Sequence, residues 1–540
     1  MSIQRKKNLL SDLSDQKRER LERKKNNLLN SLLEQQDDLD EEGLGKKLYY
    51  DNQEETAKKI AENILNDSGI FFQLVIAETQ TGKTACMIAI IQKCFTLDKN
   101  EPVINPENIY ILTGVSSTDW RDQTKKRMCN TLKHKVYHRN DLKNKNEIKN
   151  NLCNALIFID EVHIASGVSM SLDKLLIEIN IKDMQELAER NINIVFISAT
   201  PNGILNDMKK WKDSKIATTV VMKPGNGYTG LSALMDQKRI FNASDLYVCD
   251  DPDYSKSQEE INKTLKKIQS SIKAIENLKN FIKIKFNIPK YIIIRTPSDK
   301  NKLAETVRGR IIKIFGSSYD FLKCDSTTDN DIVNILKKKP EKHTVLFIKE
   351  QLRCAVTLEP KENIGVLYER INKSSKNHDA TMVQGLAGRA TGYNVPPDVY
   401  VYTSLNSIKK YIETAKDNFS DMSKITYYGH KNENRKSLAH PNTYKNTGMN
   451  NIVLNTKSNI ELEHKLFENG QEQDALDFIL EKFNINNMRK CSKEAPKELK
   501  NNDENPTLDY VLNRKWGLSN TNIVRQIRLD TDQICIYWKK

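Results

Sequence analysis

The sequence lacks any long apolar run. No stretch approaches the ~20 apolar residues that a helix needs to cross a bilayer, and the basic N-terminus continues into a charged segment rather than into the apolar core of a secretion signal. We therefore expect no membrane partner. Hydrophobic residues make up 38% of the chain and charged residues 29%, a low apolar share for a compact globule. The apolar residues nonetheless gather in blocks such as Phe71–Ala77 and Ala155–Ile159, which excludes wholesale disorder.

Closely spaced cysteine pairs are also missing. The nine cysteines are scattered and none is spaced as CxxC, which argues against a structural zinc site. Their odd number and wide spacing favour a reducing compartment, such as the cytoplasm. The charge balance, in contrast, is clearly basic, with a formal net charge of +14. This excess favours a polyanionic partner, although composition alone does not distinguish nucleic acid from an anionic membrane surface.

The length predicts several domains. At ~150 residues per domain, 540 residues are too many for one ordinary core. Short β-branched runs alternate with helical stretches in two regions, which predicts an α/β protein with two similar parallel sheets covered by helices. The expected divisions are a charged helical arm (1–45), a first α/β domain (46–240), a helical linker or insertion (241–285), a second α/β domain (286–410), a polar linker (411–459) and a small C-terminal domain (460–540).

The arm carries basic and then acidic clusters around leucines and contains no proline before Gly43. This pattern predicts a long exposed helix. The alternatives left open are a coiled-coil arm and a solvated helix that contacts nothing.

The strongest chemical signal is a phosphate-binding loop. The segment Ala77–Thr84 (AETQTGKT) lies between the apolar strand Leu74–Ala77 and the helix-prone run Ala85–Gln92. A loop in this setting directs backbone N–H groups and a helix N-terminus at phosphates. We expect Lys83 to reach the terminal phosphates and Thr84 to hold Mg²⁺. The remaining nucleotide contacts are expected from Thr79, Gln80, Thr81 and Gly82.

Two further strands end in polar residues. Leu156–Ile159 is followed by Asp160, Glu161, Val162 and His163, and Ile194–Ile197 is followed by Ser198, Ala199, Thr200 and Pro201. Parallel strands end at one edge of a sheet, so both groups can meet the phosphate loop. Asp160 would then hold the metal, and Glu161 would position or deprotonate the attacking water.

These three motifs, in this order, resemble those of superfamily 2 helicases and translocases, with a Walker A motif, a DEAH-like box (Asp-Glu-Val-His) and a Ser-Ala-Thr motif. The resemblance implies two tandem RecA-like P-loop domains, with His163, Ser198 and Thr200 coupling the nucleotide site to the rest of the protein. In the second domain, Gln384–Tyr393 (QGLAGRATGY) resembles the final motif of the family. It implies that Gln384 and Arg389 are catalytic and that Arg389 reaches the γ-phosphate. Gly392 stands where the family has a second arginine.

The resemblance also implies the remaining contacts. Gln53, which follows two tyrosines, resembles the upstream glutamine that recognises adenine. Trp120 is also consistent with a place in the core. Arg353 and Thr357 would serve backbone contact or coupling. The residues at the positions of the nucleic-acid motifs are Thr113, Gly114, Trp120, Arg121, Arg295, Thr296, Arg353 and Thr357.

We therefore predict an ATP- and Mg²⁺-dependent helicase or translocase that moves along DNA or RNA. One alternative is the motor subunit of a larger restriction or transcription complex, held through the arm or the C-terminal domain and translocating without unwinding. Another is a nucleotide-gated nucleic-acid clamp with little turnover, which Gly392 supports. Richness in Asn, Lys and Ile suggests an AT-rich genome of viral or phage type without establishing an origin. For a viral protein, the reducing compartment would be the host cell or the virion.

Overall fold

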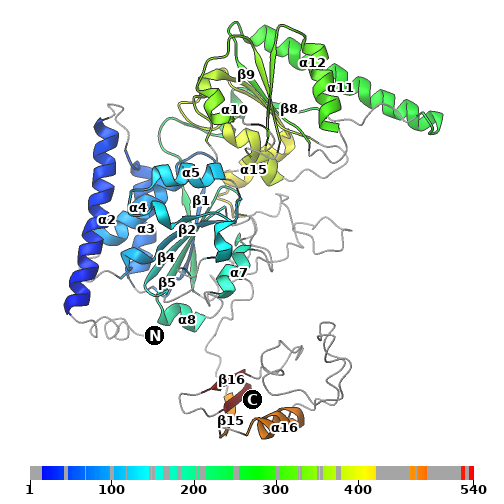
Figure 1. The fold of residues 1–540 in the computed structure, drawn as a ribbon. Helices are drawn as coiled ribbons and strands as arrows, with labels where there is room; N and C mark the ends of the chain where they lie inside the picture. The colour runs from blue at the N-terminus through cyan, green and yellow to red at the C-terminus, as the bar shows by residue number, and fades with distance from the viewer. Residues whose placement is uncertain are drawn as a thin grey trace. The chain divides into compact units, whose positions relative to one another are not determined.

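The structure is a computed structural model, and the chain divides into two compact units, residues 1–454 and 455–540 (Figure 1). The larger unit holds two parallel sheets. The described residues are 15–41, 47–66, 68–97, 103–116, 118–144, 148, 152–161, 171–178, 184–201, 204–205, 208, 215–246, 254–297, 303–325, 328, 331–349, 352, 357–371, 379–420, 462–468, 471–482, 525–528 and 534–539.

The first sheet has six parallel strands in the order β3-β2-β4-β5-β1-β6. Every residue of β1, β4 and β5 is buried, because helices cover both faces of the sheet. The strands are β1 (Phe72–Ala77), β2 (Ile109–Thr113), β3 (Val136–Tyr137), β4 (Ala155–Asp160), β5 (Ile192–Ser198) and β6 (Ala217–Met222). The strand that precedes the phosphate loop therefore lies inside the sheet, between β5 and β6.

Two sets of helices cover the first sheet. On one face lie α3 (Asp51–Leu65), α4 (Lys83–Thr96) and α5 (Thr118–Arg127), and on the other lie α7 (Ser171–Glu178) and α8 (Met184–Glu189) (Figure 1). The short helical turns of this domain are η1 (Pro106–Asn108), η2 (Lys133–Lys135) and η3 (Asp141–Asn144). Val75 and Ala77 face α3 and α4, while Leu74 and Ile76 face the opposite core, as the alternation along a strand requires.

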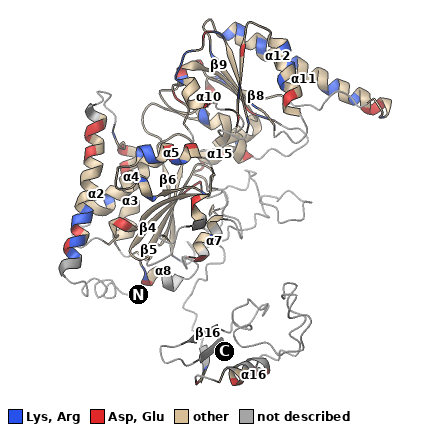
Figure 2. Ribbon diagram, in the orientation of Figure 1, with Lys and Arg blue, Asp and Glu red and all other residues tan. Residues whose placement is uncertain are grey.

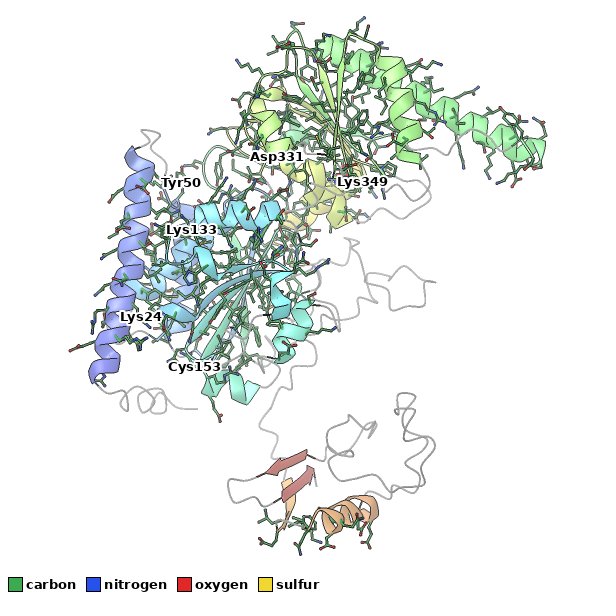
Figure 3. The ribbon with its side chains drawn as sticks, in the orientation of Figure 1. Lys24, Tyr50, Lys133, Cys153, Asp331 and Lys349 are labelled. Carbon is green, nitrogen blue, oxygen red and sulfur yellow. The ribbon has the colours of Figure 1, made fainter. Side chains whose placement is uncertain are left out.

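The N-terminal arm differs from the expected free helix. Helix α2 (Asp15–Glu41) lies along the first domain, where Leu28 and Leu32 are buried in the core that α3 and α4 share. Lys24 forms an ion pair with Glu107 from the same side of the helix (Figure 3). Basic side chains of α2 gather in its N-terminal half and acidic ones in its C-terminal half (Figure 2). Leucines four residues apart share one helix face, and that face finds its partner within the chain.

The second sheet also has six parallel strands, in the order β10-β11-β9-β12-β14-β8. Its strands are β8 (Ile240–Asn242), β9 (Tyr291–Arg295), β10 (Asp320–Cys324), β11 (Thr344–Ile348), β12 (Ile364–Tyr368) and β14 (Tyr400–Thr403). The helices and helical turns around it are α11 (Gln258–Lys285), α12 (Leu303–Phe315), α13 (Ile332–Leu336), η4 (Lys361–Asn363), α14 (Asp379–Met382), η5 (Val383–Ala387) and α15 (Leu405–Lys416). Two helix-covered parallel sheets confirm the predicted tandem RecA-like fold.

The segment 241–285, expected as a linker or insertion, is an integral part of the second domain. Strand β8 pairs with β14 at the edge of the sheet, and α11 buries Ile275, Leu278 and Ile282 in its core. The expected boundary at residue 410 also differs, because it falls inside α15. Tyr411 and Phe419 pack in the core of the larger unit.

A small ladder joins the two domains. Strand β7 (Tyr228–Thr229) of the first domain, which precedes α10 (Leu231–Asp236), pairs antiparallel with β13 (Gly392–Tyr393) of the second. The Tyr411 hydroxyl donates a hydrogen bond to the carbonyl oxygen of Ala199 (3.2 Å), so α15 also contacts the end of β5. Each of these contacts includes a predicted motif on one side, the final motif at Gly392 and Tyr393 and the Ser-Ala-Thr motif at Ala199.

The smaller unit holds an antiparallel sheet in the order β15-β17-β16, formed by β15 (Leu462–Phe467), β16 (Arg525–Arg528) and β17 (Ile534–Lys539), with helix α16 (Glu472–Lys482). Strand β17 contains the apolar run Ile534–Trp538. The polar linker expected at 411–459 lies largely outside the described residues. Among the residues that the structure describes, no helix is both long enough and apolar enough for a membrane span.

Candidate nucleotide site between the two domains

The phosphate loop joins β1 to the N-terminus of α4, where Gly82 caps the helix at φ 91°. A Cβ atom at position 82 would lie 2.5 Å from Nε2 of Gln53, so the loop requires glycine there. Gln53 is buried, and its Nε2 donates to the carbonyl oxygen of Thr81 (2.9 Å) while its Oε1 accepts from the Tyr50 N–H (2.6 Å). Gln53 thus supports the backbone of the phosphate loop.

Glu161 is the centre of the site. Its Oε1 lies 3.2 Å from the Lys83 ammonium nitrogen, and its Oε2 accepts hydrogen bonds from Ser198 Oγ (3.2 Å) and from Nε2 of Gln384 (2.9 Å). Its side chain is 2% exposed. Gln384 belongs to the second domain, so the structure brings together the phosphate loop, the ends of β4 and β5, and the final motif.

The two carboxylate oxygens of Asp160 differ in their hydrogen bonding. Trp120 Nε1 donates to its Oδ2 (2.8 Å), whereas its buried Oδ1 has no hydrogen-bond partner among the described residues. Burial raises the pKa of the Asp160 carboxyl to about 6, and the charge of Glu161 adds to this effect, against the opposing influence of Lys83. Because Thr84 lines the same cavity, Thr84 and Asp160 fit the hydroxyl and carboxylate ligands that Mg²⁺ takes beside phosphates.

The second domain contributes a buried loop. Arg389 is 2% exposed and donates from its guanidinium to the carbonyl oxygens of Gln384 (2.9 Å) and Gly385 (3.4 Å). Glu369 accepts a hydrogen bond from the Leu386 N–H (2.9 Å) and pairs with Arg295 (2.5 Å). This ion pair fixes the loop that carries Gln384 and Arg389.

A second contact lies at the phosphate loop itself. The hydroxyls of Thr79 and Thr391 are 2.9 Å apart, and the Tyr228 hydroxyl donates to the carbonyl oxygen of Thr79 (2.6 Å). Thr81 is buried, and its hydroxyl donates to the carbonyl oxygen of Glu78 (2.8 Å). The conformation of the loop is thus tied to the second domain.

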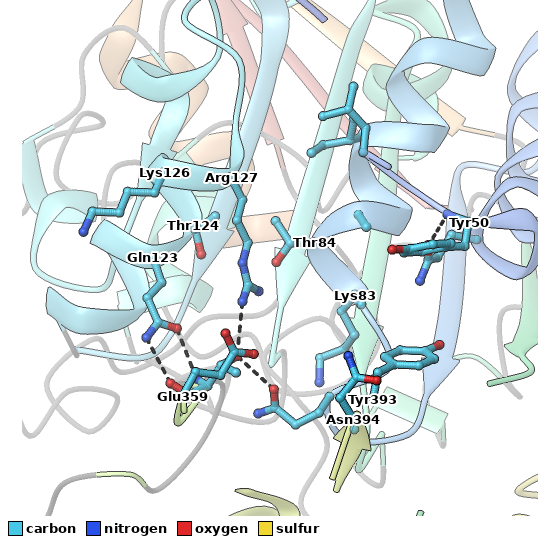
Figure 4. A pocket seen from close by; sticks show the side chains of 18 of the residues that line it. Tyr50, Lys83, Thr84, Gln123, Thr124, Lys126, Arg127, Glu359, Tyr393 and Asn394 are labelled. Atoms are coloured by element: carbon cyan, nitrogen blue, oxygen red, sulfur yellow. Dashed lines mark hydrogen bonds between the residues drawn. The ribbon is translucent and has the colours of Figure 1, made fainter. Parts of the chain in front are cut away.

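The cavity beside these residues has a volume of about 850 Å³ (Figure 4). Both domains line it, and so does α2, through Gln35 and Leu39. Tyr50 and Tyr393 stand at one side with ring centroids 6.5 Å apart and 28° between their planes. Its polar lining includes Gln53, Thr79, Gln80, Lys83, Thr84, Gln123, Arg127, Asp160, Thr357, Lys361 and Arg389.

The expected nucleic-acid contacts are largely wrong for the described residues. Thr113 is fully buried, and its hydroxyl donates to the carbonyl oxygen of Asp160 (2.9 Å), while Gly114 beside it is also buried. Trp120 is 2% exposed and holds Asp160, so it provides no stacking surface. Thr113 ends β2, Gly114 follows it and Trp120 lies in α5, and all three are buried near the end of β4, which carries Asp160.

Two of the predicted second-domain contacts, Arg295 and Thr296, are also buried, whereas the predictions for Thr357 and for Arg121 of the first domain are not contradicted. Arg295 is 7% exposed and pairs with Glu369, and the Thr296 hydroxyl donates to the carbonyl oxygen of Ile348 (3.0 Å). Thr357 lies at the cavity, where its hydroxyl donates to Oε1 of Gln80 (2.8 Å). Arg121 is partly exposed and pairs with Asp122 (2.9 Å). His163 and Arg353 lie outside the described residues.

Sequence reasoning missed several residues of the site. Lys361 lies outside every motif, Tyr393 ends the final motif without a predicted role, and Trp120 was expected to contact nucleic acid rather than Asp160. The N–H of Thr357 donates to Oε1 of Gln123 (3.1 Å), and Arg127 donates to the Thr357 hydroxyl (3.2 Å). The basic residues at the end of α5 are visible in the sequence, but the local pattern does not show that they face the second domain.

Thr200 is 1% exposed, and its hydroxyl has no hydrogen-bond partner among the described residues. Its N–H donates to Ser198 Oγ (3.1 Å).

Comparison with known proteins gives distant likenesses. No family model matches the sequence. The uncharacterized protein L594 of Acanthamoeba polyphaga mimivirus is 28% identical over 375 residues, which are 65% of this chain and 84% of that protein. The fold assignment rests on the two parallel sheets and on the motifs that meet between them. The fold is superfamily 2 helicase-like.

Solved helicase structures resemble the chain at low identity. The DEAH/RHA helicase HrpB of Escherichia coli is 13% identical over 65% of this chain and 43% of that chain, with a TM-score of 0.38. Mss116p bound to ssRNA and AMP-PNP is 14% identical over 71% of this chain and 77% of that chain, with a TM-score of 0.40. The chain thus spans less than half the length of HrpB.

The hydrogen bond from Trp120 to Asp160 offers a test of the expected role of Asp160 as a metal ligand. Trp120→Phe keeps an aromatic ring but removes the N–H that holds Asp160. We expect the Mg²⁺ concentration that half-saturates Mg²⁺-dependent binding of a fluorescent ATP analogue to rise about tenfold, because groups that orient metal ligands contribute affinities of this order. A matched Tyr137→Phe variant, also altered in the first-domain core, should keep the original Mg²⁺ requirement. An unchanged requirement in a folded Trp120→Phe variant would contradict the role of this hydrogen bond.

Proposed function

We propose that the protein is an ATP-dependent helicase or translocase that hydrolyses ATP between its two domains and moves along DNA or RNA. The observation that carries this proposal is the direct contact of Glu161 with both Lys83 and Gln384. A motor must couple nucleotide chemistry to the relative position of its domains, and here one carboxylate contacts the phosphate loop and the opposite domain at once.

The roles follow from the chemistry of each group. Lys83 neutralises the terminal phosphates, and Glu161 orients the attacking water and accepts its proton. Ser198 and Gln384 hold the carboxylate in position. Arg389 stabilises the charge of the transferring phosphoryl group once its guanidinium turns from the carbonyl oxygens that it now contacts.

The cofactors of this proposal are ATP and Mg²⁺. The ion would be held by Thr84 and Asp160 and would neutralise charge on the phosphates. Among the described residues, no group of three or more His, Cys, Asp or Glu side chains is placed to hold a metal on its own, so the phosphates would complete the site. The base would lie beside Tyr393 and Tyr50, a residue that is 48% exposed.

The polymer partner of the proposal is DNA or RNA. The net charge of +14 supports a polyanion, and the partly exposed Arg121 and Lys125 of α5, with Lys126, present basic groups on the first domain. Since Thr113, Trp120, Arg295 and Thr296 are buried, the backbone contacts must come from other residues than those that the sequence indicated.

The test is the ATPase rate of the full chain with single-stranded DNA, duplex DNA, single-stranded RNA and no polymer. We expect at least one polymer to raise the rate, and polymer affinity to fall about a thousandfold or more from 50 to 200 mM salt, as expected for several phosphate contacts. Hydrolysis that no polymer stimulates, with salt-independent binding, would contradict the proposal. Slow turnover with tight ATP-dependent polymer binding would instead indicate a clamp, and stimulation by duplex without strand separation would indicate a translocating subunit.

A further inference from the structure

Lys361 is a buried lysine of the second domain that the motifs do not include. It is 6% exposed and lines the nucleotide cavity, and its ammonium donates a hydrogen bond to the carbonyl oxygen of Thr391 (2.7 Å). No carboxylate among the described residues forms an ion pair with it. A buried ammonium without a carboxylate at ion-pair distance costs free energy, and an anion bound in the cavity would offset that cost.

Gly392 brings this ammonium to the phosphate loop. The glycine has φ 121°, and a Cβ atom at its position would lie 2.9 Å from Nζ of Lys361 and 3.2 Å from Cβ of Gln80. The Lys361 ammonium therefore fills the space of the missing side chain, beside a residue of the phosphate loop. An arginine at position 392 would compete with Lys361 for the same space, so the glycine and the lysine are complementary.

Three other cations that line the cavity have partners within the protein. Lys83 is 3.2 Å from Glu161, Arg389 contacts the carbonyl oxygens of its own loop, and Arg127 donates to Thr357. Among the described residues, the buried Lys361 ammonium has one hydrogen-bond acceptor, the carbonyl oxygen of Thr391. An ammonium has three N–H donors, so two of them can bind an anion in the cavity. A lysine suits this task as a compact charge with three donors.

We propose that Lys361 contacts the terminal phosphates of the bound nucleotide from the second domain, in the place that a second arginine would otherwise occupy. The inference rests on the proposed function, because it names a further ligand of the same nucleotide site. It predicts that the second domain distinguishes ATP from ADP through a lysine as well as through Arg389.

The protonation of Lys361 provides an independent signature. Burial lowers its pKa to about 8, and Arg389 lowers it further while Glu359 opposes the shift. Glu362 and Lys83 line the same cavity. The ammonium is present below this pKa and is lost as the pH rises through it, so affinity for ATP should fall above about pH 8. Bound phosphate favours the charged form and raises the pKa of Lys361 in the complex, so the affinity declines between the pKa of the free protein and that of the complex.

The experiment measures the affinity of the full chain for fluorescent ATP and ADP analogues across this pH range, with Lys361→Met, Lys361→Arg and the control Lys337→Met. Lys337 is an exposed lysine that lines the same cavity, so its loss removes an equal charge. We expect Lys361→Met to weaken ATP binding about tenfold and ADP binding much less, since it removes one charge-assisted hydrogen bond to a phosphate. The decline above about pH 8 should disappear in Lys361→Arg, because a guanidinium does not titrate there.

The possible outcomes separate the two proposals. If the unmodified protein binds no ATP, the proposed function fails. If it binds ATP normally and Lys361→Met behaves like Lys337→Met, only the assignment of Lys361 is overturned. A flat pH profile of the unmodified protein also overturns it, and this measurement needs no variant to fold.

Discussion

Lys83→Ala is expected to abolish ATP hydrolysis. The lysine places its ammonium 3.2 Å from Glu161 at the end of the phosphate loop, and no other side chain of the loop supplies a positive charge for the terminal phosphates. The change also leaves Glu161 buried without that cation, which disfavours the ionised carboxylate. Phosphate release measured with saturating ATP and Mg²⁺ should fall to background.

The matched control is Lys93→Ala. Lys93 lies on the same helix, α4, and pairs with Glu54 away from the cavity, so its loss removes the same charge from the same element. Turnover by this control should stay within about twofold, because surface ion pairs contribute little. A Lys83→Ala protein that hydrolyses ATP as fast as the Lys93→Ala control would remove the phosphate-loop assignment and the motor proposal with it.

Glu161→Gln should slow ATP hydrolysis but leave ATP binding intact. A neutral isostere cannot accept a proton from water, so hydrolysis should slow by about a hundredfold or more, as general-base catalysis predicts. Binding of ATP should persist, because the amide oxygen can still accept from Gln384 or Ser198. Single-turnover hydrolysis and equilibrium binding of an ATP analogue, measured on the same preparation, separate these two effects.

Glu54→Gln serves as the control for this isosteric change, since Glu54 pairs with Lys93 at the surface of the first domain. Its turnover should match that of the unmodified protein. If Glu161→Gln also turned over normally, the carboxylate would have only a structural role at the end of β4. Loss of ATP binding in Glu161→Gln would point to the same conclusion, because catalysis and binding would then have failed together.

The sequence predicts which side chains meet at the edge of the first sheet, for a physical reason. The strands at Leu74–Ala77, Leu156–Ile159 and Ile194–Ile197 are continuous apolar runs, and buried parallel strands require such runs. The polar residues that follow them must then meet at one sheet edge. Local spacing and one rule of topology are enough to bring Lys83 and Glu161 together.

Several residues that were predicted to contact nucleic acid are buried. Whether a side chain near the end of a strand is buried depends on residues that are distant in the sequence. Thr113 and Trp120 become supports of Asp160 once β2 and α5 lie beside β4. Arg295 is paired with Glu369, which comes from another strand end of the second domain. Neither partner could be read from the local pattern. Lys361 was missed for the same reason, since its place depends on Gly392.

The predicted domain boundaries differ from those of the structure where the elements are short or amphipathic. Strand β8 has three residues, too few for a recognisable alternation, yet its pairing with β14 assigns it to the second sheet. The polar face of α11 suggested a linker, although Ile275, Leu278 and Ile282 form the face that packs. Only the pairing of distant strands and the packing of helices in three dimensions assign these segments to a domain.

Helix α2 uses its leucine face within the chain, and this limits how a partner chain can bind it. Leu28 and Leu32 are buried, while Gln35 and Leu39 of the same helix form part of the wall of the nucleotide cavity. A second helix that competed for these leucines would have to displace α2 and would open that wall. Capture of α2 by a coiled-coil partner and retention of the nucleotide would then oppose each other, whereas a partner that binds the charged outer face would leave the cavity closed.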